Sequence, residues 1–153
     1  TLMFSATWSD PVQQMADQFM INPCTISLAR SVDAAANRDV QQVILLADSM
    51  AQKKAKTLEL LRGLRAEHPN KSRAMVFVNE KRSVKSMVTA LSAEFGNVFG
   101  LHGKVVQSER EKALEAFRAT PTAILVATDV ASRGLDIKGL ECVINVDVPS
   151  SIE

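Results

Sequence analysis

Short apolar runs alternate with longer amphipathic stretches along most of this 153-residue chain. The runs are rich in β-branched residues and contain few polar ones, a pattern typical of strands buried on both faces of a parallel sheet. The stretches between them carry apolar residues at intervals of three and four, which predicts helices. We therefore predict an α/β fold, a doubly wound parallel sheet flanked by helices, with strands at residues 43–47, 74–78, 98–101, 123–127 and 142–146.

The first 40 residues differ from this repeat. Residues 1–4 and 24–28 are expected to be short strands, and apolar spacing predicts a helix at residues 12–20 between them. Residues 29–40 mix small and charged side chains without an apolar face, which is typical of a linker. The sequence starts without a methionine, so we expect an excised fragment whose main domain occupies residues 41–153.

Composition and charge narrow the class of function. The 18 Lys and Arg against 17 Asp and Glu leave a formal charge of +1, so nucleic-acid binding would need locally placed cations. Only 5% of the residues are aromatic, which argues against a surface that stacks bases and leaves contacts to the sugar-phosphate backbone. With 46% apolar residues, the chain is too hydrophobic to be disordered throughout.

The two cysteines, Cys24 and Cys142, form no C-x-x-C motif, and we expect neither a metal site nor a disulfide. Such cysteine usage fits a reducing, intracellular compartment, either cytoplasm or nucleus. No apolar run approaches the ~20 residues of a membrane span, and no signal peptide is recognisable. We therefore expect no membrane partner.

Polar residues directly follow the predicted strands. Ligands of doubly wound sheets bind beyond the carboxyl ends of the strands, so these positions are where chemistry is expected. They are Asn79-Glu80, His102-Gly103, Thr128-Asp129 and Asp147.

The turn at His102-Gly103 leads into a predicted helix that carries Gln107 and Arg110. A glycine lets the backbone approach a phosphate closely, and an arginine near a helix start adds charge-assisted hydrogen bonds to the same oxygens. The structural alternative is a satisfied loop histidine, a glycine required by a positive-φ turn, and a solvated helix face. These residues alone leave both interpretations open.

The run TDVASRGLD follows the next predicted strand. The Thr128 hydroxyl with adjacent amides could hold a phosphate, and the Asp136 carboxylate could accept both hydrogen bonds of a ribose diol. Structural roles are also possible: Thr128 and Asp129 as helix caps, Gly134 as a C-cap, and Arg133 with Asp136 as a weak surface pair.

In order and spacing, these segments resemble the second RecA-like domain of the DEAD-box ATP-dependent RNA helicases, over essentially the whole chain. About a dozen residues match in register, which makes an accidental match improbable. The matching segments are Ser5-Ala6-Thr7, Val76-Phe77-Val78, His102-Gly103 with Gln107-x-x-Arg110, Ala127-Thr128-Asp129-x-Ala131-x-Arg133-Gly134-Leu135-Asp136-Ile137, and Val143-Ile144-Asn145-x-Asp147-x-Pro149.

The resemblance implies a RecA-like fold and, for the complete protein, an RNA-stimulated ATP hydrolase that unwinds short duplexes. ATP with Mg²⁺ would be its cofactor and RNA its partner. Residues 1–28 would end a first RecA-like domain, in which Ser5 and Thr7 couple the nucleotide state to unwinding.

The resemblance also implies roles for residues at the carboxyl edge. One group would hold phosphates of one RNA strand with little sequence preference, since phosphates carry no sequence information: Gly103, Gln107, Arg110 and Thr128. A second group would serve ATP and the contact between the two domains: Gly134 and Asp136 at the ribose, Asp129 and Arg133 in the interdomain network.

Two residues depart from the family pattern: Glu80 replaces a threonine whose hydroxyl contacts an RNA phosphate, and Lys104 replaces an aspartate. We predict that Glu80 repels RNA; the alternative is that it turns away and pairs with Lys81 or Arg82. The phosphate loop, the Asp-Glu-Ala-Asp sequence and the arginine-rich motif are not among these residues, so we expect the chain alone to be inactive, with Mg²⁺ held by the first domain. The alternative function is an RNA clamp or scaffold without hydrolysis.

Overall fold

A computed structural model of the chain describes residues 1–5, 10–26, 39–129 and 137–148. The chain divides into two compact units, one within residues 1–44 and one within residues 45–152. The second unit contains the sheet and all of the helices that pack on it.

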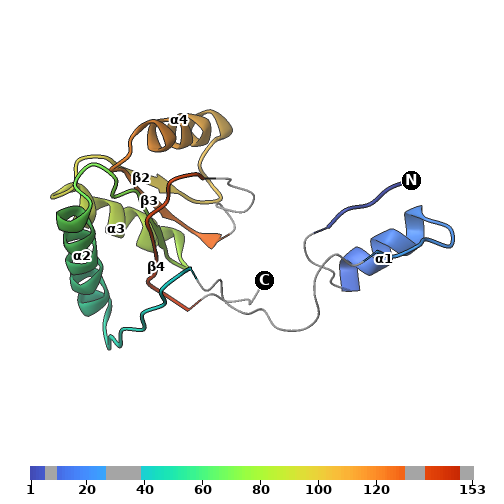
Figure 1. Cartoon of the computed structure of the whole chain (residues 1–153), viewed down its shortest axis with the longest axis horizontal. Coiled ribbons are helices and arrows are strands. Elements are labelled where there is room, and N and C mark those ends of the chain that lie inside the picture. Colours follow the sequence, from blue (N-terminus) through green and yellow to red (C-terminus); the bar gives the residue numbers. More distant parts are fainter. Residues whose placement is uncertain (6–9, 27–38, 130–136, 149–153) are drawn as a thin grey trace. The chain divides into compact units, whose positions relative to one another are not determined.

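Four parallel strands form the sheet of the second unit: β1 (Ala74–Phe77), β2 (Val98–Leu101), β3 (Ile124–Ala127) and β4 (Cys142–Asn145). Their order across the sheet is β2-β3-β1-β4, so the two central strands are β3 and β1 (Figure 1). Every residue of β3 is buried, as the unbroken apolar run predicted. The predicted parallel sheet is confirmed.

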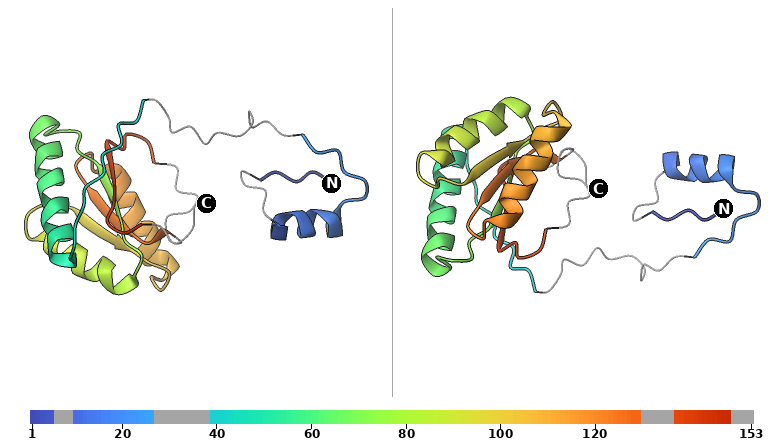
Figure 2. Two further views of the ribbon diagram at one scale, coloured as in Figure 1. Left: turned by 90° about the horizontal axis from the view of Figure 1, so that it is seen from below. Right: turned by 90° about the horizontal axis from the view of Figure 1, so that it is seen from above.

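Three helices cover the two faces of this sheet: α2 (Met50–Glu67), α3 (Lys81–Ser92) and α4 (Gln107–Ala119). Figure 2 shows α4 on one face and the pair α2 and α3 on the other. The side chains of Val76 and Val126 pack with α2 and α3, while Leu125 packs with Phe117 of α4. Alternate residues of the strands therefore serve opposite layers, which confirms the doubly wound architecture.

Helix α3 lies unusually close to the edge strand β2. A Cβ added to Gly100 would lie 3.1 Å from Val88 Cγ2 and 3.2 Å from Val84 Cγ1. These separations are tighter than ordinary van der Waals contact, so the absence of a side chain at Gly100 permits the close packing of α3 on β2.

The loops at the amino edge of the sheet are joined by Arg73. Its guanidinium donates hydrogen bonds to three backbone oxygens, those of Arg118 at 2.8 Å, Thr120 at 3.3 Å and Lys138 at 2.6 Å. The first two belong to the end of α4, where carbonyl groups lack partners within the helix and favour a cation. Arg73 thereby connects the end of α4 to the loop before β4.

Helix α1 (Asp10–Phe19) confirms the predicted N-terminal helix, but the described residues of three other predicted strands form no strand. Residues 1–4, 24–26 and 43–47 pair with none of the four strands of the sheet. Most of their side chains are exposed, for example Phe4 at 87% and Ile44 at 89%. A strand needs a neighbour for its backbone N–H and C=O groups, so apolar composition alone was insufficient for a strand at these positions.

Candidate functional site

Backbone hydrogen bonds bring the loops at the carboxyl edge together. The N–H of Thr128 donates to the oxygen of Leu101 at 3.2 Å, and the N–H of Val78 donates to the oxygen of Ala127 at 3.0 Å. At the other side of β1, the N–H of Val146 donates to the oxygen of Phe77 at 2.9 Å. The residues predicted to carry chemistry after β1, β2, β3 and β4 therefore lie along one edge of the sheet.

The turn after β2 is closed by His102. Its Nδ1 accepts a hydrogen bond from the N–H of Lys104 at 3.3 Å, and its carbonyl oxygen accepts one from the N–H of Val105 at 3.0 Å. Gly103 is exposed, its φ lies outside the left-handed region, and an added Cβ would meet no atom within 4 Å. The alternative that a positive-φ turn requires this glycine is therefore wrong, and folding places no steric demand for glycine here.

Helix α4 begins four residues after Gly103 and has no side-chain cap, because its N-cap residue is Val106. The first N–H groups of a helix lack partners within it and carry a partial positive charge. Arg110 adds a half-buried guanidinium in the next turn, whereas Glu109 adds a carboxylate in the first. The amide nitrogen of Gln107 donates to Glu111 Oε1 at 2.7 Å, so this side chain lies along the helix.

Thr128 is only 9% exposed, and Asp129 beside it is half-buried. Ser5 lies in the other compact unit and is exposed. The remaining predicted site residues lie outside the described part of the chain: Thr7, Arg133, Gly134 and Asp136.

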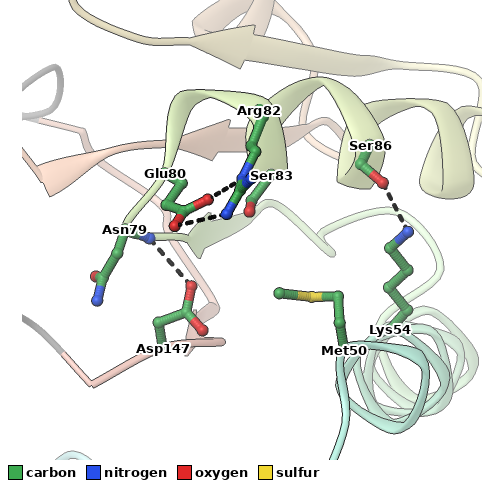
Figure 3. Close-up of a pocket in the computed structure, with 8 residues that line it drawn as sticks. All are labelled: Met50, Lys54, Asn79, Glu80, Arg82, Ser83, Ser86 and Asp147. Atoms are coloured by element: carbon green, nitrogen blue, oxygen red, sulfur yellow. Dashed lines mark hydrogen bonds and ion pairs between the residues drawn. The ribbon is translucent and has the colours of Figure 1, made fainter.

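Glu80 forms an ion pair with Arg82 (Figure 3). Arg82 Nη2 donates to Glu80 Oε1 at 3.1 Å, and Arg82 Nε donates to the second carboxylate oxygen. The pairing that the sequence left as an alternative is thus present. The side chains are 51% and 85% exposed, so the pair lies at the surface of the carboxyl edge.

A network around Asp147 was not predicted from the sequence. Lys53 Nζ donates to Asp147 Oδ1 at 2.6 Å, and the N–H of Asn79 donates to Oδ2 at 3.1 Å. The Asn79 amide nitrogen also donates to the oxygen of Val148 at 2.8 Å. Asp147 was noted for its position after a strand, but its partner Lys53 is 94 residues away in the chain.

The pKa of the Asp147 carboxyl reflects two opposing effects. Partial burial raises this pKa, and the hydrogen bonds from Lys53 and from the Asn79 N–H lower it by more, so that it lies below its ordinary value. The carboxylate form of Asp147 therefore joins α2 to the loops that follow β1 and β4.

Among the described residues, no group of three or more His, Cys, Asp or Glu side chains could hold a metal ion. The same residues include no helix that is long and apolar enough to cross a membrane.

Residues 52–153 match the family model of the helicase conserved C-terminal domain. The chain belongs to this family. The ATP-dependent RNA helicase DBP3 of Coccidioides immitis is 37% identical to it over 153 residues, which are 100% of the chain and 30% of the relative. The ATP-dependent RNA helicase DBP2 of Candida albicans is 36% identical over 153 residues, again all of the chain and 26% of that protein. This chain thus spans less than a third of the length of these two relatives.

Solved structures agree with this assignment. The structure described as S. cerevisiae Dbp5 bound to RNA and ADP BeF3 has a TM-score of 0.73 and 30% identity, covering 97% of this chain and 36% of that one. Domain 2 of the DEAD-box helicase Mss116p, bound to an RNA duplex, has a TM-score of 0.62 and 26% identity, covering 66% of this chain and 41% of that one. The predicted resemblance to DEAD-box helicases and the predicted RecA-like fold are confirmed.

Proposed function

We propose that this helicase C-terminal domain holds the sugar-phosphate backbone of one RNA strand and completes the ATP site of an ATP-dependent RNA helicase. The observation that carries the proposal is Gly103. It is exposed, unstrained and surrounded by open space, so its lack of a side chain serves no contact of the fold. A ligand that approaches the backbone closely is the reason for a glycine at such a position.

The surroundings of Gly103 suit a phosphate. The uncapped start of α4 presents N–H groups and the positive end of its dipole, and Arg110 supplies a charge that can form bidentate hydrogen bonds. The backbone of Thr128 is bonded to the end of β2, which brings a second polar residue to the same edge. Such contacts to phosphates would be insensitive to base sequence.

The ATP-binding and coupling roles rest on the family resemblance. Gly134 and Asp136 would contact the ribose, and Asp129 and Arg133 would brace the contact with a first RecA-like domain that ends within residues 1–28. Ser5 and Thr7 would couple nucleotide state to RNA in that first domain, which would also hold Mg²⁺. The Dbp5 structure is described as bound to RNA and ADP BeF3, which supports the proposal that this domain serves both RNA and a nucleotide.

The RNA role is tested by substituting Gly103→Ala and measuring the binding of labelled single-stranded RNA of several sequences. The added methyl group would keep one phosphate away from the backbone and so remove a charge-assisted hydrogen bond. Such a bond contributes about 1.5–3 kcal/mol, so the affinity for RNA should fall tenfold or more. The matched control is Gly63→Ala, because Gly63 is exposed in α2 and an added Cβ there also meets nothing within 4 Å. The melting temperature should not fall in either variant, and RNA binding should fall only in Gly103→Ala. Equal RNA affinity in both variants would contradict the proposal.

Arg110→Ala provides an independent measurement on the same RNAs. Loss of one cationic phosphate contact should lower the slope of log K against log salt by about 0.7 for a single strand. The loss should be the same for every sequence. A loss confined to some sequences would show that the domain reads bases.

The catalytic role is tested by ATP hydrolysis. We expect no turnover above the buffer blank with this chain alone, because phosphoryl transfer requires groups that position the γ-phosphate and stabilise its charge. The complete protein should hydrolyse ATP, with stimulation by RNA. RNA binding without any ATP turnover in the complete protein would favour the clamp or scaffold function instead.

A further inference from the structure

Six cations occupy the first two turns of α2 and α3. They are Lys53, Lys54 and Lys56 on α2, and Lys81, Arg82 and Lys85 on α3. Neither helix has an acidic residue in its first turn. Both helices begin near the carboxyl edge, since Met50 of α2 and Ser83 of α3 line the same hollow as Asp147 (Figure 3).

This placement opposes the usual electrostatics of helices. The N-terminus of a helix carries a partial positive charge, which favours Asp and Glu and disfavours Lys and Arg. In α3, Lys81 and Arg82 lie in the first turn, where this effect acts, and the N-cap residue Glu80 pairs with Arg82. Lys53 of α2 pairs with Asp147, so the six cations still outnumber these two acids at this end of the helices. Unfavourable charge of this kind is expected where a negatively charged ligand binds.

Three of these cations, Lys54, Arg82 and Lys85, line a groove formed by two adjoining hollows, each of ≈ 530 Å³. The hollow at the carboxyl edge includes Asn79, and both of its acids are paired, Glu80 with Arg82 and Asp147 with Lys53. The outer hollow runs between the two helices and, in the described part of the chain, is lined by no acid. Its lining residues are Lys54, Arg82, Lys85, Ser86, Thr89 and Ala90.

Lys54 and Ser86 belong to both hollows and connect the two helices. Lys54 Nζ donates to Ser86 Oγ at 2.6 Å, which fixes the ammonium group at the boundary between the hollows (Figure 3). An ammonium has three N–H donors, so two remain after this bond. The hydroxyl of Ser86 accepts the bond from Lys54 and keeps its own O–H as a further donor, whereas the hydroxyl of Thr89 donates to the backbone oxygen of Lys85 at 3.0 Å.

We propose that this groove, defined by Lys54, Arg82 and Lys85, is an accessory site for the RNA backbone. It would hold phosphates of the strand beyond those at Gly103 and Arg110. The proposal rests on the proposed RNA-binding function, because the groove continues from the same carboxyl edge. Its ligand is RNA because the outer hollow is lined by three cations and, among the described residues, by no acid, which complements a phosphate backbone.

The test compares RNAs of two lengths, about 6 and about 20 nucleotides of oligouridine, with the whole chain and its Lys54→Gln/Lys85→Gln variant. The variant should bind the long RNA about tenfold more weakly and the short RNA with less than a twofold change. Its salt slope on the long RNA should fall by about 1.4, because two cationic contacts are removed and each contributes about 0.7 on a single strand. The melting temperature should change little, because the one bond that is lost, from Lys54 Nζ to Ser86 Oγ, is exposed to solvent and a glutamine amide can replace it.

The matched control is Lys71→Gln/Lys138→Gln, which removes the same charge from exposed residues at the amino edge. It should leave the binding of both RNAs unchanged. An equal loss of both RNAs in the groove variant, or no loss of either, would overturn the accessory site. Binding of polyglutamate that is lost in the variant, with long-RNA binding unchanged, would identify an acidic protein as the ligand and would also overturn it.

Arg110→Ala, measured on the same two RNAs, separates this proposal from the function on which it rests. If Arg110→Ala weakens both RNAs and the groove variant weakens neither, only the accessory site fails. If Arg110→Ala weakens neither and the groove variant still weakens the long RNA, the groove binds RNA and the proposed grip at α4 fails.

Discussion

Removing the charge of Glu80 should strengthen RNA binding, and the structure indicates why. The carboxylate accepts hydrogen bonds from Nε and Nη2 of Arg82, so this guanidinium is occupied at the edge where RNA is proposed to bind. Glu80→Gln leaves the size of the side chain almost unchanged but releases Arg82 as a cation. Two unit charges ~6 Å apart interact by roughly 0.7 kcal/mol in water, so a net change of one charge near a phosphate corresponds to about a threefold change in Kd.

A double-mutant cycle distinguishes release of Arg82 from direct repulsion by Glu80. We expect Glu80→Gln to lower the Kd for RNA at least about threefold, and by less when Arg82→Gln is already present, because that background loses the negative charge but has no guanidinium to release. Fluorescence anisotropy at about 50 and 200 mM salt measures both, and the gain should be larger at the lower salt, where screening is weaker. The control is Glu94→Gln, because Glu94 forms a similar two-bond surface pair with Arg62.

The outcomes of this cycle are distinct. An equal gain with and without Arg82 would show that Glu80 repels RNA directly and that its pairing is irrelevant. No gain at the lower salt in either background would refute both explanations. Glu80→Thr should exceed Glu80→Gln only if the hydroxyl also contacts a phosphate.

Two further predictions concern folding stability. Gly100→Ala should lower the free energy of unfolding by about 1 kcal/mol in a urea titration, because its Cβ would lie 3.1 Å from Val88 Cγ2 and 3.2 Å from Val84 Cγ1. With Val88→Ala already present, Gly100→Ala should cost less, because only the contact with Val84 remains. Asp147→Asn should be less stable than the parent chain at pH 7, where the lowered pKa of the carboxyl contributes stability. That difference in stability should disappear in acid, as the pH falls from near 3.8, the ordinary pKa of an aspartate, through the lower pKa of Asp147 in the folded state. Unfolding midpoints measured over a series of pH values check this.

The sequence predicted the layered sheet because its signals are local and repeated. The apolar spacing of α2, α3 and α4 and the buried runs of β1 and β3 arise within a few residues, and the structure places them as expected. The apolar run at residues 43–47 had a similar signal but lacks a strand to pair with in the described sheet. Pairing depends on distant parts of a chain, which composition does not specify.

The candidate site was less predictable than the fold. Its place at the carboxyl edge followed from the rule that ligands of such sheets bind beyond the carboxyl ends of the strands. Gly103 was recognised from the sequence, but only the structure excluded a turn that requires glycine there. The bond between Lys53 and Asp147 joins residues 94 positions apart, for which a single sequence gives no signal. The cationic groove was also missed, because its lysines are spaced along two helices whose packing brings them together.

The hydrogen bonds of Arg73 have a consequence for mutational robustness. They connect the loops at the amino edge of the sheet, while the residues proposed to bind ligands follow the carboxyl ends of the strands. A substitution at Gly103 or Glu80 therefore leaves this connection intact. Ligand contacts at the carboxyl edge can therefore change while the bonds of Arg73 preserve the packing of α4. A probe or fusion partner attached at the amino edge, away from Arg73 itself, would lie far from the proposed ligand contacts.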